Sequence, residues 1–324
     1  MTGSAINWRP QASLQTLQAR ARMLKCIRAF FDARQVLEVE TPVLYETGAM
    51  DPHIDSMSTH WSEHRPPVYL QTSPEYAMKR LLAAGSGPIY QVSHVFRFGE
   101  RGRQHHPEFS MLEWYRPGLD HHQLMDEVEA LVQEVLNQSI QLRPTLRWTY
   151  RQAWQMMLSV DPFVINSADL QVLAKQRGLD TENIGEDKDI WLQLLMSHVV
   201  EPALPKNTPV FIYDFPASQA ALARIRYDDI PVAERFELYV NGMELANGFH
   251  ELNHAAEQRR RFDDDNTSRK SMGKPNMQID EKLLAALPEL PDCAGVALGL
   301  DRLLMLATNS QTIDEVLAFT LNEN

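Results

Sequence analysis

The sequence contains only two cysteines, Cys26 and Cys293, among 324 residues. Two thiols cannot build a disulfide framework or a four-cysteine zinc site, so we expect them to stay reduced. The sequence also lacks any uncharged apolar run near the roughly 18 residues that a membrane-spanning helix needs. These absences predict a cytoplasmic protein that has no membrane partner.

The sequence also lacks an excess of basic over acidic residues. The chain has 31 Lys and Arg against 43 Asp and Glu, which gives a net charge of −12. A large nucleic-acid footprint needs a net basic surface, so the charge argues against one. The 44% of hydrophobic residues is ordinary for a globular protein and excludes a disordered chain.

Neither of the common glycine-rich phosphate motifs occurs. The absence of G-x-x-x-x-G-K-[ST] and G-x-G-x-x-G excludes a P-loop and a Rossmann site. Several β-rich segments instead stand between amphipathic helices, and they cover residues 89–98, 108–116, 210–215, 234–252 and 294–298. Long antiparallel strands flanked by helices predict an α+β fold rather than alternating βαβ units.

The first 31 residues contain Arg and Lys but no Asp or Glu, and transit peptides show the same bias. Apolar residues within this segment nevertheless follow helical spacing behind an N-cap at Ser13. They are Leu14, Leu17, Ala21, Leu24 and Phe31. We therefore favour a folded basic helix over a cleaved signal. Its Arg20, Lys25 and Arg28, with Arg101 and Arg103 elsewhere, either steer an acidic protein partner or only solubilise the surface.

A hairpin is predicted around Asn241-Gly242, the strongest two-residue turn signal. Such a turn pairs Tyr239 with Glu244 and Glu237 with Ala246, and it places Glu237 and Glu244 on one face. The two carboxylates could hold Mg²⁺, or they could be solvent-facing residues of an exposed hairpin. A bulge at Asn247-Gly248 would turn Glu251 to the same face.

Two further segments could bind phosphate. Residues 95–115 carry Arg97 on a strand and an Arg-rich loop, whose guanidinium groups match phosphate oxygens or simply lie on the solvated surface. The loop histidines, His105 and His106, have no third ligand at a recognisable zinc spacing. Residues 295–306 contain a glycine-flanked strand followed by a helix whose first turn carries Arg302. This segment either binds phosphate or is a buried strand-to-helix connection that needs the same glycines.

Taken together and in this order, three segments resemble the signature motifs of class II aminoacyl-tRNA synthetases. Residues 37–42 (L-E-V-E-T-P) resemble motif 1, residues 96–109 motif 2 and residues 299–303 (G-L-D-R-L) motif 3. The resemblance is closer to the lysyl subgroup, on residues 73–76, 111–115 and 244–249. It implies a single class II catalytic domain over residues 1–324, with an antiparallel sheet flanked by helices, and a homodimer formed through motif 1.

Motif 1 begins by residue 37, so only an N-terminal helix within residues 1–35 precedes it, and we expect no anticodon-binding OB domain. The sequence, notably over residues 108–117 and 215–220, is similar to truncated paralogues of lysyl-tRNA synthetase that attach lysine or (R)-β-lysine to elongation factor P. This resemblance implies ATP-dependent formation of a lysyl-adenylate and transfer to a lysine side chain of that factor, with no tRNA. The alternatives are a free-standing lysine-activating or tRNA-charging enzyme, and an inactive regulatory paralogue.

The resemblance also implies a set of site residues. Arg97 and Arg302 would be catalytic, at the α- and γ-phosphates of ATP, and Glu237 and Glu244 would hold Mg²⁺. Lysine would be bound by Ser73, Glu75, Glu113, Tyr115, Asn247, Glu251 and Ala297. ATP would be bound by Arg97, Gly99, Glu100, His106, Phe109, Glu237, Leu238, Gly299 and Arg302.

Three positions depart from the family pattern. Gly99 stands where many relatives have Glu, with Glu100 one position later, and His106 stands where Asn is usual. Ala297 replaces a glycine of lysyl-tRNA synthetases, and its methyl group could favour a β-amino acid over an α-amino acid.

Overall fold

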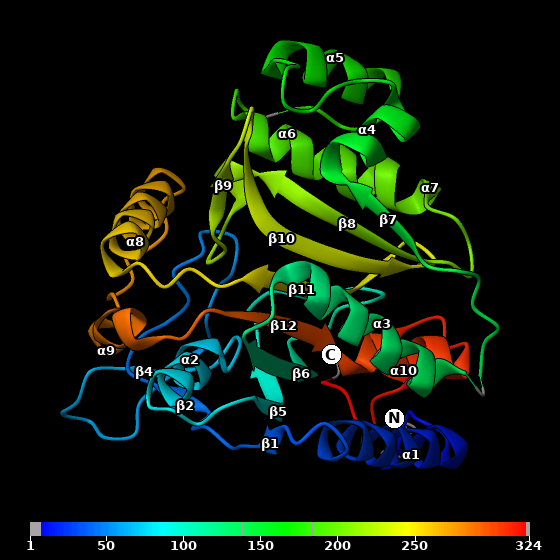
Figure 1. Cartoon of the computed structure of the whole chain (residues 1–324), viewed down its shortest axis with the longest axis vertical. Coiled ribbons are helices and arrows are strands. Elements are labelled where there is room, and N and C mark those ends of the chain that lie inside the picture. The colour runs from blue at the N-terminus through cyan, green and yellow to red at the C-terminus, as the bar shows by residue number, and fades with distance from the viewer. Residues whose placement is uncertain (1–7, 138, 183, 322–324) are drawn as a thin grey trace, which may run out of the picture.

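The computed structural model describes residues 8–137, 139–182 and 184–321, so both ends of the predicted domain lie outside the described residues. In this part of the chain, nine strands form one large sheet that helices flank, which confirms the predicted α+β class (Figure 1). The strand order is β1-β5-β6-β12-β11-β10-β8-β7, with β9 paired to β10. The strands are β1 (Leu37–Glu38), β5 (Ile89–Phe96), β6 (Glu108–Pro117), β7 (Leu146–Thr149), β8 (Pro209–Pro216), β9 (Ile225–Tyr227), β10 (Pro231–Val240), β11 (Met243–His250) and β12 (Cys293–Gly299).

Pairing in this sheet is antiparallel except at its two edges, where β1–β5 and β7–β8 are parallel. A smaller sheet contains β2 (Leu44–Tyr45), β4 (Val68–Leu70) and β3 (Ser58–Thr59). Residues 137–209 contain several helices and also β7, which is too short to show a clear alternation in the sequence.

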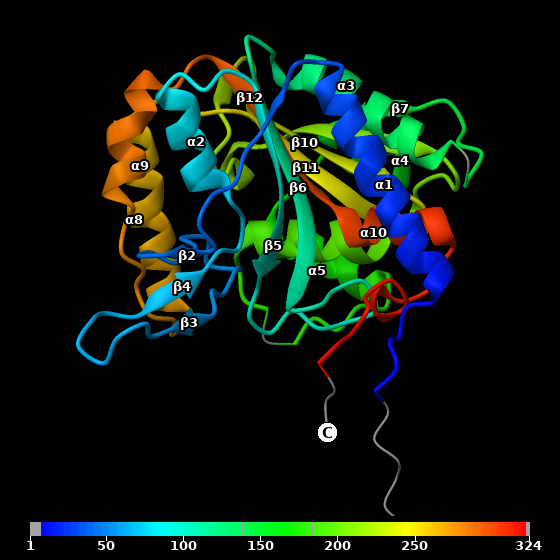
Figure 2. The ribbon, with the colours of Figure 1, turned by 90° about the horizontal axis from the view of Figure 1, so that it is seen from below.

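Two groups of helices lie on opposite sides of strands β5, β6 and β12 (Figure 2). One group is α1 (Leu14–Asp32), α3 (His121–Leu136) and α10 (Leu300–Thr308), and the other is α2 (Glu75–Ala83), α8 (Ala255–Ser271) and α9 (Glu281–Ala286). Beside β7 and β8 lie α4 (Tyr150–Leu158), α5 (Ser167–Gln176), α6 (Lys188–Leu195), a π-helical turn (Met196–Val200) and α7 (Glu201–Ala203). Short 3₁₀ turns cover Ala217–Gln219, Leu287–Glu289 and Ile313–Glu315. None of the helices in the described ranges combines the length and the apolar character needed to cross a membrane.

The basic N-terminal helix is folded into the domain, as predicted. Ser13 caps α1 by accepting a hydrogen bond from the backbone N–H of Thr16. The helix buries Phe31 against Tyr90 and Trp114, with ring centroids 4.3 and 5.4 Å away. Burial of one such aromatic side chain contributes about 1.5–3 kcal/mol, so α1 is part of the core.

The hairpin of β10 and β11 forms at the predicted turn, where Asn241 and Gly242 have φ values of 57° and 76°. Tyr239 pairs with Glu244 as predicted, but Glu237 pairs with Asn247 and not with Ala246. The predicted bulge position was wrong, because the register already shifts between Leu238 and Tyr239. This earlier bulge turns Asn247, as well as Glu251, to the face that carries Glu237.

Candidate active site

A cavity of about 830 Å³ lies over this face of the sheet, lined by residues of β6, β10, β11, β12, α2 and the loop after β5. Every predicted site residue lines it except Leu238. The Leu238 side chain is fully buried in the main hydrophobic core, which leaves only its backbone for the predicted contact with ATP. Its neighbour Glu237 faces the cavity, and successive side chains of a strand point to opposite faces.

One end of the cavity contains a buried carboxylate, Glu113 of β6. Ser73 Oγ donates a hydrogen bond to Glu113 Oε2 at 2.7 Å, and Tyr115 Oη donates to Glu113 Oε1 at 2.6 Å. Burial, reinforced by the nearby Glu75, raises the pKa of Glu113 to about 8. The carboxylate is therefore held in place by two hydroxyl groups, yet no cation among the described residues pairs with it.

Two more carboxylates at this end share a single buried ammonium group. Lys79 Nζ lies 2.6 Å from both Glu75 Oε1 and Glu251 Oε2, and its side chain is 1% exposed. Burial opposes the charge on Lys79, but the two carboxylates raise its pKa, whereas burial raises the pKa of Glu251 to about 7. With Glu113, three acids face one lysine, so full ionisation leaves two surplus negative charges. This end of the cavity is suited to a ligand with two cationic groups.

The floor of this end is built from β11 and β12. A Cβ at Gly295 would lie 2.3 Å from Tyr115 Cε1 and 2.4 Å from Glu251 Oε1, so only glycine fits there. Ala297 pairs with Asn247 on one side and with Glu113 on the other, which places its methyl group between them. Asn247 Oδ1 is buried without a hydrogen-bond partner among the described residues. It is available to a donor from a ligand.

At the other end, Arg97 follows β5 and faces the cavity. Its guanidinium lies 5.2 Å from the Phe109 ring centroid, and its Nη1 lies 3.7 Å from Glu100 Oε1. Gly99 has a φ of 78°, a backbone conformation that strongly favours glycine. Glu100 lines the same cavity one residue later.

His106 and Arg302 complete the loop side of this end. His106 Nδ1 lies 2.6 Å from the backbone oxygen of Glu108 and 3.2 Å from its backbone nitrogen. Its Nε2 is buried without a partner in the described structure, so it is available to a ligand. Arg302 is placed by the first turn of α10, which begins after Gly299, and donates to the backbone oxygen of Glu244 at 2.8 Å. Its Nη2 lies 2.6 Å from His105 Nε2.

The hairpin carboxylates Glu237 and Glu244 lie in this part of the cavity, so the solvent-facing alternative fails for Glu237, which is 7% exposed. Tyr239 Oη donates to Glu237, and Arg235 pairs with it. Burial, opposed by Arg235 and reinforced by Glu244, raises the pKa of Glu237. Carboxylate oxygens facing an open cavity are a donor set that suits Mg²⁺.

Sequence reasoning missed three charged residues of the site. Lys79 stands one helical turn after Glu75, and Arg235 stands two positions before Glu237 on a strand, so both were detectable by spacing. Glu201 begins α7, and burial next to Glu237 and Glu244 raises its pKa to about 8. No local signal indicated Glu201, because tertiary packing alone brings it there.

Comparison with known proteins gives one family. The model of class II tRNA synthetases (D, K and N) matches residues 1–323. The elongation factor P–(R)-β-lysine ligase of Pasteurella multocida is 50% identical over 318 residues, which are 97% of each chain. The proteins of that name from Edwardsiella ictaluri and Klebsiella pneumoniae are 50% and 49% identical, over 98% and 97% of this chain and 98% of theirs.

Proposed function

The chain belongs to the class II tRNA synthetase family, and we propose that it is a ligase that joins lysine or (R)-β-lysine to a lysine side chain of elongation factor P. The observation that carries the substrate assignment is the set of three carboxylates, Glu75, Glu113 and Glu251, that faces the single ammonium group of Lys79 and carries two surplus negative charges when fully ionised. Lysine and β-lysine each bring two ammonium groups, which these charges would neutralise in charge-assisted hydrogen bonds. Glu75 would take the amino group near the carboxylate, and Glu113 with Glu251 would take the distal one.

Adenylation is the proposed first step. A carboxylate oxygen of the amino acid attacks the α-phosphorus of ATP, and the bond to the pyrophosphate oxygen breaks. Arg97 would lie against the α-phosphate and the carboxylate, where negative charge builds up, and Phe109 and Glu100 hold its guanidinium. Arg302 would neutralise the γ-phosphate, and His106 Nε2 would accept a hydrogen bond from the adenine amino group.

The residues present fit a Mg²⁺ ion at Glu237 and Glu244. The ion would supply positive charge to the phosphates of ATP. Arg235 and Tyr239 hold Glu237 in place, so the carboxylate is oriented before ATP binds.

Transfer is the proposed second step. The amine of the acceptor lysine attacks the acyl carbon, the bond from that carbon to the AMP oxygen breaks, and the amine loses a proton. No covalent link to the enzyme is needed, so catalysis rests on positioning and charge stabilisation. The Ala297 methyl group, which lies between Asn247 and Glu113, is the feature that we propose favours the β-amino acid.

Two measurements test this proposal. Lysine-dependent exchange between ATP and pyrophosphate reports adenylation, and the intact mass of elongation factor P after incubation reports transfer. We expect exchange, and a gain of one lysyl residue that bulk tRNA does not suppress. Exchange without transfer would support a free-standing activator, tRNA charging would support a synthetase, and the absence of exchange would support an inactive paralogue.

A further inference from the structure

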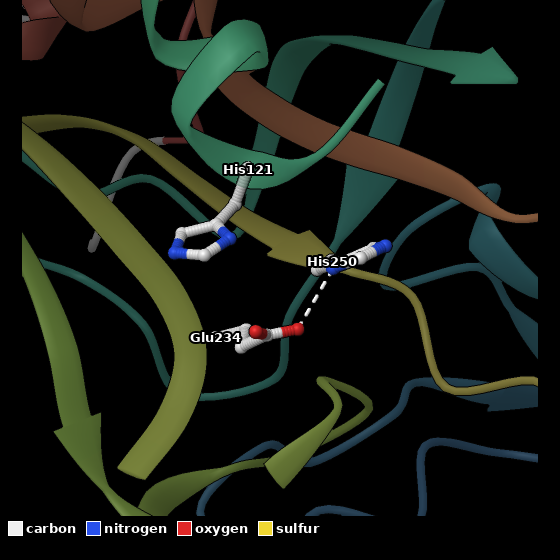
Figure 3. Close-up of side chains that lie close together, drawn as sticks. All are labelled: His121, Glu234 and His250. Atoms are coloured by element: carbon white, nitrogen blue, oxygen red, sulfur yellow. Dashed lines mark hydrogen bonds and ion pairs between the residues drawn. The ribbon is translucent and has the colours of Figure 1, made fainter. Parts of the chain in front are cut away.

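Outside the cavity, His121, Glu234 and His250 lie together below the start of α3 (Figure 3). Each residue offers one ligand atom, and these atoms all lie within 4.8 Å of one another. None of the three lines the cavity. His250 directly precedes Glu251, so the alternation of β11 turns it to the opposite face of the sheet.

His121 is the residue of this cluster that most clearly has room for a further partner. Its side chain is 3% exposed, and neither ring nitrogen has a hydrogen-bond partner among the described residues. A buried polar group without a partner loses the hydrogen bonds that it made with water, so buried polar groups are rarely left in this state. Figure 3 shows that the His121 ring extends from α3 and lies beside His250 and Glu234.

The surrounding residues hold the other donors in a defined orientation. His250 Nε2 lies 2.9 Å from Asp292 Oδ1, and its Nδ1 lies 2.7 Å from Glu234 Oε2. Arg226 donates to Asp214 Oδ2 at 2.9 Å and lies 3.6 Å from Glu234 Oε1. Arg226 therefore leaves the other oxygen of each carboxylate, Asp214 Oδ1 and Glu234 Oε2, to face the cluster.

Asp214 supplies a fourth donor. Its Oδ1 is buried without a hydrogen bond in the described structure and lies 3.9 Å from His121 Nε2. A histidine whose second nitrogen is held by a carboxylate, as His250 is by Asp292, is the usual arrangement of a metal ligand.

We propose that His121, His250 Nδ1 and Glu234, with Asp214 as the fourth ligand, bind one divalent transition-metal ion of the Zn²⁺ class. Two imidazoles with carboxylates are a Zn²⁺ donor set, whereas Mg²⁺ prefers oxygen ligands alone. Binding replaces the proton between His250 Nδ1 and Glu234 and releases it to solvent. The ion would link α3 to β8, β10 and β11. One of its ligands, His250, directly precedes Glu251 in the chain.

The test uses the purified full-length protein without ATP. After dialysis against a chelator, Co²⁺ is titrated and its visible d–d absorption is recorded. We expect one Co²⁺ per chain with micromolar or tighter affinity, displacement by Zn²⁺, and a higher melting temperature with Zn²⁺. A wild-type protein that binds neither ion at 1 mM would overturn the proposal without any variant.

Matched variants locate the ion. His121→Ala and His250→Ala should each lose the bound equivalent, whereas His60→Ala, at an exposed loop position, should retain it. Glu237→Gln should also retain it, because Glu237 lies in the cavity on the other face. Loss of Co²⁺ in Glu237→Gln together with retention in His121→Ala would place the ion in the cavity and contradict the proposal.

Discussion

Glu113 is the residue at which the electrostatics of the cavity can be tested most directly. Its carboxylate is oriented by Ser73 and Tyr115 without a paired cation in the described part of the chain, and burial raises its pKa to about 8. A protonated Glu113 cannot pair with an ammonium group. A cationic ligand must therefore expel the proton at any pH below about 8.

We predict that the affinity for lysine rises with pH from 6 to 8, by up to roughly tenfold per pH unit for this one proton. Glu113→Gln should weaken binding and reduce the slope by about one proton. A smaller slope should remain, because the pKa of Glu251 is raised to about 7. Calorimetric titration of lysine at several pH values measures both effects, and an unchanged slope in the variant would refute the role of Glu113.

The proposed Mg²⁺ ligands give a second prediction at this scale. Glu237→Gln and Glu244→Gln should each lower the exchange rate at limiting Mg²⁺ by at least roughly 10- to 100-fold, with partial recovery at high Mg²⁺. Glu63→Gln, in an exposed loop, is the matched control. Melting temperatures show whether the variants are folded. Wild-type exchange by both folded variants would remove these residues from the metal site.

At the scale of elements, the turn between β10 and β11 is constrained by more than its backbone angles. Gly242 has a φ of 76°, and a Cβ there would lie 2.7 Å from the backbone oxygen of Glu201. Gly178 has nearly the same φ, 75°, with open space around it. An Ala substitution at Gly178 therefore measures the loss of stability that the positive φ causes. The same substitution at Gly242 measures that loss together with the loss from the contact with Glu201.

We predict that Gly242→Ala lowers the free energy of unfolding by about 1–3 kcal/mol more than Gly178→Ala, which should cost about 1–2 kcal/mol. Urea titration of each variant measures the difference. Equal losses would show that the turn moves away from α7 at no cost.

Helix α1 contributes less free positive charge than its sequence suggests. Arg20 pairs with the buried Asp301 and donates to the backbone oxygen of Val316, and Arg28 binds Glu38. Reversing Arg20 would thus break the link between α1 and α10, so it cannot test partner docking cleanly. Arg22 and Lys25 are exposed and suit that test.

If α1 steers elongation factor P, Arg22→Glu combined with Lys25→Glu should slow transfer several-fold at low salt. Lysine-dependent exchange should stay at the wild-type rate, because these residues do not line the cavity. High salt should abolish the difference. Equal transfer rates at low salt would show that α1 has no part in docking.

For the whole molecule, residues 37–44, which contain motif 1 and the first residue of β2, present an apolar surface. Leu37, Val43 and Leu44 are 55%, 40% and 46% exposed, beside the parallel edge pair of β1 and β5. Large apolar side chains gathered on one segment are typical of an interaction site. They support the homodimer that the family resemblance implies, which stays a prediction.

We predict a dimer at micromolar concentration and a shift to monomer in Leu44→Lys, measured by light scattering. Leu321→Lys, which replaces an equally apolar exposed residue outside motif 1, should remain a dimer. A wild-type monomer at this concentration would contradict the prediction.

The sequence by itself determined the elements whose signals are local: the capped helix α1, the Asn241-Gly242 turn, the longer strands of the large sheet, and the family motifs with nearly all their cavity residues. The tertiary structure decided the bulge in the hairpin, the placement of Lys79 between Glu75 and Glu251, the pairing of Arg20 with Asp301, and the cluster of His121, Glu234 and His250. Periodicity, caps and turn angles act over a few residues, so the sequence displays them directly. Contacts between residues far apart in the chain depend on how whole elements pack, and a shift of one residue in a strand changes which side chains meet.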